Sequence, residues 1–480
     1  LENKILVLLN ENQEMMRKSG ATQIYQVTFG SNISNPIKVS IEQFSGIEIN
    51  DFAVTVARTA LWIAESQMMK ETEAIVHMEL DFLPLKTTAH IVEGNALRID
   101  WGSVTDRNIL NYIMGNPPFV GYALQSKTQK YDVLSVFLDE KGKNYKGSGK
   151  IDFVAAWYFK AAEMMYRTNI RAAFVSTNSI TQGEQVSTVW KPLYKRFNIH
   201  IDFAYQTFKW DSEAKDKAAV HCVIIGFSCI HRENCTIYSE NGRVKDADNI
   251  SPYLINSPNI WIESRTKPID NVSIMQKGSQ PTDGGYLILS PDERNELIKE
   301  DSSSEKYIKQ YTGAREFINH TKRYCLWLQD IQPNEIRKHP SILKRIKLVQ
   351  EERAKSKKEA TRKMALYPHL FTENRQPQSN YLLVPSVSSE NRRYIPIGYM
   401  SPDVVASNLV FTIPNATLYE FGILTSNVHM AWMRSVAGRL EMRYRYSNNI
   451  VYNNFPWPSP TKEQKDMIEK AAQEILNART

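Results

Sequence analysis

The sequence predicts an α/β fold with a parallel sheet in its first half and a second, α+β domain after about residue 250. Strand-like and helix-like runs alternate between residues 44 and 227, as they do in open α/β sheets. At 480 residues the chain is too long for one ordinary hydrophobic core. Beyond residue 250 the helical periodicity fades, turns rich in Pro and Ser multiply, and a basic segment appears.

The elements of the first half follow one another in a regular order. The run 44–49 predicts a short strand, and Asp51 can cap a helix from 52 to about 69. Further strands are expected over 90–96, 109–114, 171–176, 199–208 and 218–227. Helices are expected over 151–166 and 184–197, and the Lys-, Gly- and Ser-rich stretch 125–149 predicts a polar loop.

The second half carries the basic segment, where residues 336–363 contain eleven Lys or Arg against three Glu. Helical spacing is plausible over 341–365, and the ordinary explanation is a solvated helix face. In a protein that handles DNA, the residues of this segment that would contact phosphates are Lys344, Arg345, Lys347 and Arg353.

The C-terminal part predicts a strand, two helices and an Arg/Tyr-rich cluster. The strand covers 408–414 and the first helix 416–434. The cluster at 439–446 includes Arg443 and Arg445, which in a protein that handles DNA would be further candidates for phosphate contacts. An extended segment, 453–458, should pack its aromatic side chains back onto the domain, and a last helix should run from 462 to about 478.

The charge of the chain and its cysteine and histidine spacing limit the kinds of partner and cofactor that we expect. A net charge of +7 and a pI near 8.9 suit an anionic partner. The four cysteines form no Cys-x-x-Cys pair and read as reduced thiols of a cytoplasmic protein. The nine histidines show no zinc-type spacing, so no metal site is expected. No signal peptide and no bilayer-length apolar stretch is apparent.

The most informative motif is Asn116-Pro117-Pro118-Phe119, which ends the strand expected over 109–114. Prolines often mark a plain strand-to-turn boundary. The motif also suits a more specific task, because the Asn116 side-chain oxygen and a proline carbonyl can each accept one N–H of an exocyclic amine. The two prolines restrict the backbone and so position these acceptors in advance. Phe119 offers a flat face for a base taken out of the duplex.

Polar residues at two earlier strand ends fit a cofactor site. A class I methyltransferase binds S-adenosylmethionine along the carboxyl ends of its strands. Glu48 can grip the ribose hydroxyls, although it could also be an ordinary acidic residue before a helix, and Ile49 can pack on the adenine or simply in the core. Asn95 can hydrogen-bond the adenine, with Asp100 as a rival. The order Glu48, Asn95, Asn116 is more specific than any single motif.

The chain resembles the γ-class DNA adenine-N6 methyltransferases, and most closely the fused type IIL restriction–modification polypeptides. The resemblance spans nearly the whole chain and is weaker over about 260–400, where such enzymes read different DNA sequences. The segments that carry it are 44–53, 58–64, 94–97, 115–119, 172–185, 208–210, 218–227, 444–447 and 451–457.

The resemblance implies a fold, a cofactor and residue roles. The fold would be a class I, Rossmann-like methyltransferase sheet over 1–245, a target-recognition domain over 246–456 and a C-terminal helix over 457–480. The implied partner is double-stranded DNA in a bacterial cytoplasm, and the implied donor is S-adenosylmethionine. The residues that would hold the target adenine are Asn116, Pro117, Pro118 and Phe119. Those that would bind the cofactor are Glu48, Ile49, Asn95, Ala96 and Asp152. The flipped base would stack on Phe119 and on Phe208 or Trp210.

Two features depart from the family pattern. Relatives usually have Asp where Asn95 stands, but an amide can still accept from an adenine amino group. The Gly-rich turn that follows the first strand of the family is not found, and residues 1–6 resemble the helix after it. That strand is central in such sheets, so its absence would leave a hole between neighbours. We therefore expect a fragment of a longer protein, with any nuclease upstream, since no nuclease motif stands out here.

Two alternative functions remain open at the level of the sequence. Without the Gly-rich turn, the chain could be a DNA-binding specificity module with no chemistry of its own. A methyltransferase acting on RNA or on a protein glutamine could also use Asn-Pro-Pro-aromatic. The basic second domain and the Tyr- and Arg-rich C-terminal part favour DNA.

Overall fold

The computed structural model describes residues 39–76, 88–210 and 220–479, and it divides into two compact units. The first unit contains the described residues up to Val175 together with 192–202 and 226–232. The second contains 176–191, the described part of 203–225, and 233–479. The helix expected at residues 1–6 lies outside the described residues.

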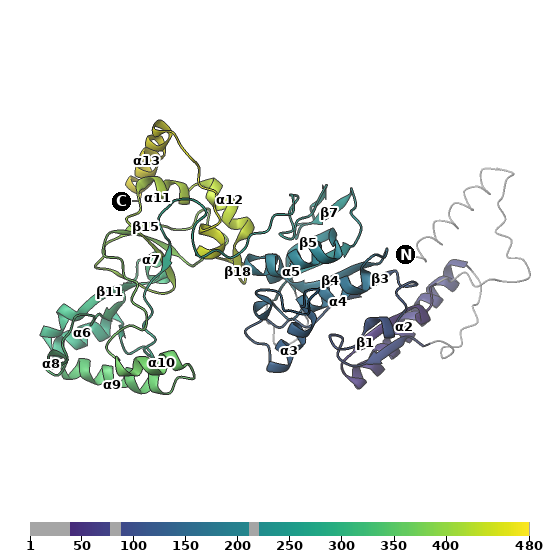
Figure 1. Ribbon diagram of the computed structural model, residues 1–480, viewed down its shortest axis with the longest axis horizontal. Coiled ribbons are helices and arrows are strands. Elements are labelled where there is room, and N and C mark those ends of the chain that lie inside the picture. The colour runs from purple at the N-terminus through teal and green to yellow at the C-terminus, as the bar shows by residue number, and fades with distance from the viewer. Residues whose placement is uncertain (1–38, 77–87, 211–219, 480) are drawn as a thin grey trace, which may run out of the picture. The chain divides into compact units, whose positions relative to one another are not determined.

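A small parallel sheet opens the first unit. Strand β1 (Ser45–Glu48) pairs with β2 (His90–Glu93), and the register places Glu48 opposite Glu93. Helix α2 (Asp51–Val76) lies along this sheet and packs Val54 against Ile91 (Figure 1). Because the strands are parallel, the residues that follow Glu48 and Glu93 emerge at one edge of the sheet.

The larger sheet has six strands, in the order β3 (Tyr112–Gly115), β4 (Arg171–Thr177), β6 (Val220–Ser228), β5 (His200–Trp210), β7 (Cys235–Tyr238) and β8 (Val244–Ala247). The pairs β3–β4 and β5–β7 are parallel, and β7–β8 is antiparallel. This sheet with its helices confirms the predicted α/β class.

Two of the edge strands of these sheets are β1 and β3. Among the strands that the structure describes, β1 pairs with β2 alone and β3 pairs with β4 alone. Tyr112 and Met114 of β3 are 65% and 77% exposed, so this edge presents apolar side chains as well as free backbone groups.

The helices of the first half follow the prediction except in one place. Helix α4 (Ala155–Met165) is buried on more than one face, and the ring of Tyr158 lies 5.2 Å from that of Phe174. Helix α5 (Gly183–Phe197) buries Trp190. The polar loop expected over 125–149 was wrong, because helix α3 (Lys127–Val136) forms inside it. Ser126 caps α3, and Val133 and Val136 are buried.

The second half is built from three small sheets and short helices, which confirms the predicted α+β domain. One sheet contains β10 (Ile288–Leu289), β12 (Tyr324–Leu326), β11 (Ile308–Thr312) and β16 (Val405–Ala406). A second contains β15 (Gly398–Met400), β13 (Tyr381–Pro385), β17 (Val410–Pro414) and β9 (Gln276–Lys277). The third contains β14 (Val387–Ser388), β19 (Arg443–Arg445) and β18 (Gly438–Leu440).

Two of the helices expected in this half are each divided into two shorter helices. The helix predicted over 341–365 divides into α9 (Pro340–Ala354) and α10 (Glu359–Lys363). The helix predicted over 416–434 divides into α11 (Leu418–Leu424) and α12 (Asn427–Val436), because Ser426 caps a new helix through its bond from the His429 N–H. The helices of this half that precede α9 are α6 (Pro291–Glu300), α7 (Ala314–Asn319) and α8 (Pro333–Ile336).

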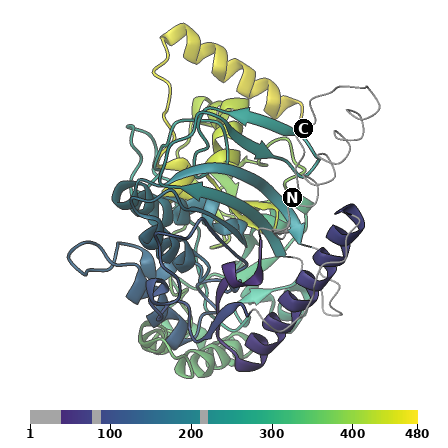
Figure 2. The same cartoon turned by 90° about the vertical axis from the view of Figure 1, so that its right-hand side faces the viewer.

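The C-terminal segment packs as the sequence predicts. Phe455 and Trp457 are 3% and 8% exposed and belong to the core beneath β13 and β17. The last helix, α13 (Lys462–Asn477), runs unbroken in Figure 2 and contacts α11, where Gly422 makes room for Ile468.

Buried His429 predicts a pH-dependent stability for the second unit. Burial lowers the pKa of His429 to about 3, and its Nε2 pairs with the Tyr446 hydroxyl at 2.9 Å. The unfolded chain takes up this proton near pH 6.5 and the folded chain near 3, so stability is lost as pH falls between them, by up to about 1.4 kcal/mol per pH unit. Urea unfolding from pH 7 to 4 should therefore show a shallower pH slope for His429→Phe than for the wild type. Parallel curves would contradict this account.

Candidate active site

The Asn-Pro-Pro-Phe turn follows β3 at its carboxyl end. Asn116 is exposed, Pro117 is buried, Pro118 is exposed and Phe119 is half-buried. The register places Gly115 opposite Phe174, whose ring lies 3.5 Å from where a Cβ at Gly115 would stand. A buried proline beside an exposed asparagine fixes the backbone while leaving the amide open to a ligand.

The segment after the turn is anchored to the start of α4. The Phe153 N–H donates to the Val120 carbonyl at 2.9 Å, and the Tyr122 N–H donates to Oδ1 of Asp152 at 3.0 Å. Asp152 is 6% exposed, so this carboxylate is a buried anchor for the loop that carries Phe119. Its predicted cofactor contact stays a prediction, and the loop contact is an additional role that the sequence did not indicate.

The residues predicted to hold the cofactor gather at one edge of the small sheet. The Gly94 N–H donates to the Glu48 carbonyl at 2.8 Å, which joins the two strand ends. Glu48 is half-buried, and its Oε1 accepts from the Ile49 N–H at 2.9 Å. The Ile49 side chain is 68% exposed, and Asn95 is half-buried. A carboxylate, an apolar side chain and an amide thus lie together where β1 and β2 end.

Asn95 is held by a partner that the sequence did not predict. Its Nδ2 donates to Oδ2 of Asp132 at 2.9 Å, and its Oδ1 accepts from the Leu97 N–H at 2.9 Å. Asp132 lies on α3. The sequence predicts a loop there, so it does not identify Asp132 as a partner of Asn95. The rival Asp100 instead caps a turn, where its Oδ1 accepts from the Gly102 N–H at 3.0 Å.

The two aromatic residues predicted to stack on the target base lie at the end of β5 in the second unit. The ring centroids of Phe208 and Trp210 are 6.3 Å apart, and Trp210 is 38% exposed. An exposed indole at a strand end is available to a ligand, and its role against a flipped base stays a prediction.

The residues predicted to contact DNA differ in their surroundings. Lys344, Lys347 and Arg445 are exposed. Arg345 is committed to its own domain, because it pairs with Glu293 at 2.9 Å and donates to the Tyr286 carbonyl. Arg443 pairs with Glu441 at 2.9 Å on an exposed surface, where such a pair is weak and easily exchanged.

The predicted phosphate contact of Arg353 was wrong. This side chain is 1% exposed, and its guanidinium donates to five main-chain carbonyls at 2.7–3.1 Å. The acceptors are Pro281, Thr282, Met364, Tyr367 and Leu370. The basic residues of α9 resembled a uniform charged face, but Arg353 lies on the buried face of this helix together with Ile342, Ile346 and Val349.

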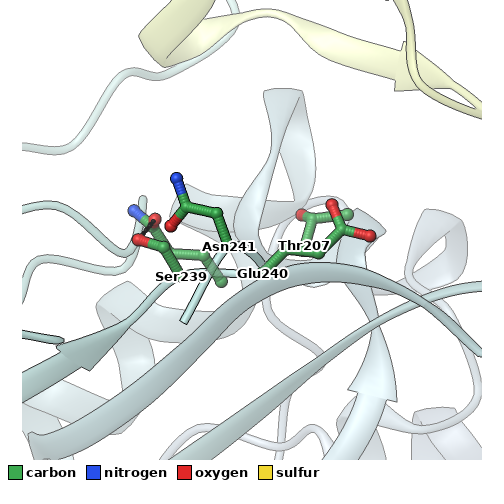
Figure 3. Close-up of a pocket in the computed structure, with 5 residues that line it drawn as sticks. Thr207, Ser239, Glu240 and Asn241 are labelled. Carbon is green, nitrogen blue, oxygen red and sulfur yellow. Dashed lines mark hydrogen bonds between the residues drawn. The ribbon is translucent and has the colours of Figure 1, made fainter. Parts of the chain in front are cut away.

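A polar hollow lies between the turn that joins β7 to β8 and the part of β5 that precedes Phe208. Thr207, Ser239, Glu240 and Asn241 line it together with Gln206, whose Oε1 accepts from the Ser239 hydroxyl at 2.9 Å (Figure 3). No buried unpaired group points into it from these residues, so it carries no argument about function.

The described ranges also bear on the requirements of a metal site and of a membrane-spanning helix. No group of three or more His, Cys, Asp or Glu there could hold a metal ion, and no helix there is long and apolar enough to cross a bilayer. All four cysteines are free thiols, and burial raises the pKa of Cys222 to about 11.

Comparison with known proteins supports the same architecture. Residues 1–239 match the family model "MmeI, DNA-methyltransferase domain", and residues 256–459 match "MmeI, target recognition domain". DNA methyltransferase A of Bacillus subtilis (strain 168) is 43% identical over 444 residues, which cover 92% of this chain and 50% of that protein. The chain therefore spans about half the length of this curated relative.

A solved structure extends the match to three dimensions. The type IIL restriction-modification enzyme MmeI in complex with DNA superposes with a TM-score of 0.87 at 43% identity, covering 100% of this chain and 63% of that one. The two family models and this structural match define a DNA methyltransferase domain followed by a target recognition domain. The chain belongs to the MmeI family.

Proposed function

We propose that this chain forms the methyl-transfer and target-recognition part of an enzyme that methylates N6 of adenine in duplex DNA, within a restriction–modification or related anti-phage system. The observation that carries the proposal is the exposed Asn116 on a turn fixed by buried Pro117, at the end of β3. The relatives named above, a DNA methyltransferase and an enzyme bound to DNA, support it.

The residues at the ends of β1 and β2 fit S-adenosylmethionine. Half-buried Glu48 offers a carboxylate suited to two ribose hydroxyls, and exposed Ile49 offers an apolar surface suited to one face of an adenine. The Asn95 Oδ1 has a second lone pair for an adenine amino group. When bound, S-adenosylmethionine would supply an electrophilic methyl group.

The Asn-Pro-Pro-Phe turn would act on the target base through position and hydrogen bonding. A flipped adenine would stack on Phe119, which is half-buried and so held in place. Asn116 Oδ1 and the Pro117 carbonyl would each accept one amine hydrogen, which increases electron density on N6 and holds it still. The amine proton can leave to water after attack, so no side chain with a perturbed pKa is required.

The second candidate is a DNA-binding specificity module without chemistry of its own. It is favoured because, in the described part of the chain, the predicted cofactor residues after β1 and β2 and the predicted target residues after β3 belong to separate sheets. Isothermal titration calorimetry of this chain with S-adenosylmethionine separates the two candidates. Cofactor binding supports the methyltransferase, whereas DNA affinity without cofactor binding supports the module.

The exposed lysines of α9 provide a test of the DNA surface. Replacing Lys344 and Lys347 together by Ala should weaken binding to cognate and unrelated duplexes alike, because phosphate contacts carry no sequence information. The slope of log affinity against log salt should fall by about 2, since each lost contact removes about 0.9. Fluorescence anisotropy across a salt series measures both.

The matched control replaces Lys462 and Lys470, which are also exposed but lie on α13. These changes remove the same charge and should leave the slope nearly unchanged. If the two double variants had the same salt slope, α9 would not be part of the DNA-binding surface.

A further inference from the structure

We propose that Asp132 is a positioning residue for the cofactor site, because it fixes the orientation of the Asn95 amide. The inference rests on the proposed function and adds a residue to it. Asp132 lies on α3 and is 2% exposed, so its carboxylate is removed from water and needs donors around it. It has two, Nδ2 of Asn95 at 2.9 Å and Nε of Arg98 at 2.8 Å.

The orientation of the Asn95 amide follows from its partners. A carboxylate only accepts hydrogen bonds, and the Leu97 N–H only donates one. Nδ2 must therefore face Asp132, and Oδ1 must face Leu97. The reversed amide would set oxygen against carboxylate and N–H against N–H, so the network permits one orientation.

The turn around Asn95 is held from two further sides. The Trp101 indole N–H donates to the Ala96 carbonyl at 2.9 Å, and the Gly94 N–H donates to the Glu48 carbonyl at 2.8 Å. One N–H of Nδ2 is committed to Asp132, so the side chain keeps its second N–H and the second lone pair of Oδ1. Asp132 thus fixes which end of the amide presents the acceptor, at the place where an aspartate would offer one.

The same network explains why position 95 carries Asn. An Asp there would place its carboxylate against that of Asp132 at hydrogen-bond distance, and two such groups cannot both ionise without strong repulsion. Exposed Arg98 pairs with Asp132 from the solvent side and offsets one negative charge but not two. Asn95 and Asp132 therefore form a matched pair, in which the acceptor role depends on the partner.

The test compares S-adenosylmethionine affinity by calorimetry in Asn95→Asp, Asp132→Asn and the double variant of the intact protein. At pH 8.5 we expect Asn95→Asp to lose at least tenfold in affinity, and to recover most of it at pH 6, where one proton is shared. The double variant, which reverses the donor and the acceptor, should bind within about threefold of the wild type at both values. Asp132→Asn should also lose affinity, because one end of the new amide is an NH2 group that must face either Asn95 Nδ2 or Arg98 Nε, and both are donors.

Controls separate this inference from simple loss of folding. Asp132→Leu removes the acceptor and should weaken cofactor binding at all pH values, while DNA affinity and the melting temperature report on the fold. Asp139→Asn changes a carboxylate just after α3 that caps its own turn, and should have no effect on the cofactor.

The possible outcomes are distinct. Wild-type affinity for Asn95→Asp at pH 8.5, or a double variant no better than Asn95→Asp alone, would overturn the positioning role while leaving methyl transfer intact. Absence of cofactor binding by the wild type would instead overturn the proposed function.

Discussion

Replacing Asn116 by Ala in the intact enzyme should lower the rate of methyl transfer to DNA by at least roughly 100-fold, the scale seen when one positioned polar group is lost from a preorganised site. Asn116 is exposed on a fixed turn and its amide oxygen would accept from the target amine. The variant should bind duplex DNA and cofactor with nearly wild-type affinity, because neither the phosphate contacts nor the ends of β1 and β2 include this side chain. Single-turnover transfer of a labelled methyl group measures the rate.

A nearby asparagine provides the control. Asn111 is also exposed, and its described bond uses the main-chain oxygen, which accepts from the Arg171 N–H at 3.0 Å. Asn111→Ala should therefore methylate at close to the wild-type rate. If both variants lost activity, or if neither did, the proposed role of Asn116 in holding the target amine would be contradicted.

Replacing Arg353 by Met should lower the free energy of unfolding by about 3 kcal/mol or more, the second large effect. The carbonyls of Met364 and Tyr367 also accept main-chain N–H groups, but those of Pro281, Thr282 and Leu370 would lose the guanidinium donor, and buried acceptors without partners are costly. Met keeps much of the aliphatic volume, so the loss reports on hydrogen bonding. Chemical denaturation followed by fluorescence measures it.

Lys347→Met makes the same kind of change on an exposed position of the same helix and should alter stability by less than about 0.5 kcal/mol. It should weaken DNA binding instead. If Arg353→Met were as stable as the wild type but defective in DNA binding, the structural role assigned to this arginine would be wrong. The phosphate contact predicted from the sequence would then be supported.

Much of the fold could be predicted from the sequence because its signals are local. The β-branched run ending at Phe227 indicates a buried strand, and Lys462–Asn477 shows a regular amphipathic pattern. The errors arose where a short polar signal competes with periodicity. Ser126 and Gln129 form a capping box that starts α3 inside a stretch that composition marks as a loop, and Ser426 ends one helix and begins another.

The site could be predicted only in part, for a different reason. Asn116, Glu48 and Asn95 follow strands, and a strand end is visible in a sequence. Asp132 and Arg353 act through partners that are distant in the chain, such as Asn95 and Pro281, so no local pattern marks them. Burial of a charged residue depends on the whole tertiary structure, which explains why Arg353 appeared to belong to a basic face.

The measurement that tests the central claim most directly is mass spectrometry of nucleosides from duplex DNA that has been incubated with the intact enzyme and isotopically labelled S-adenosylmethionine. We expect label in N6-methyl-2′-deoxyadenosine and its loss with Asn116→Ala. Label in N4-methyl- or 5-methyl-2′-deoxycytidine, or no label in DNA from an enzyme that binds both ligands, would contradict the account.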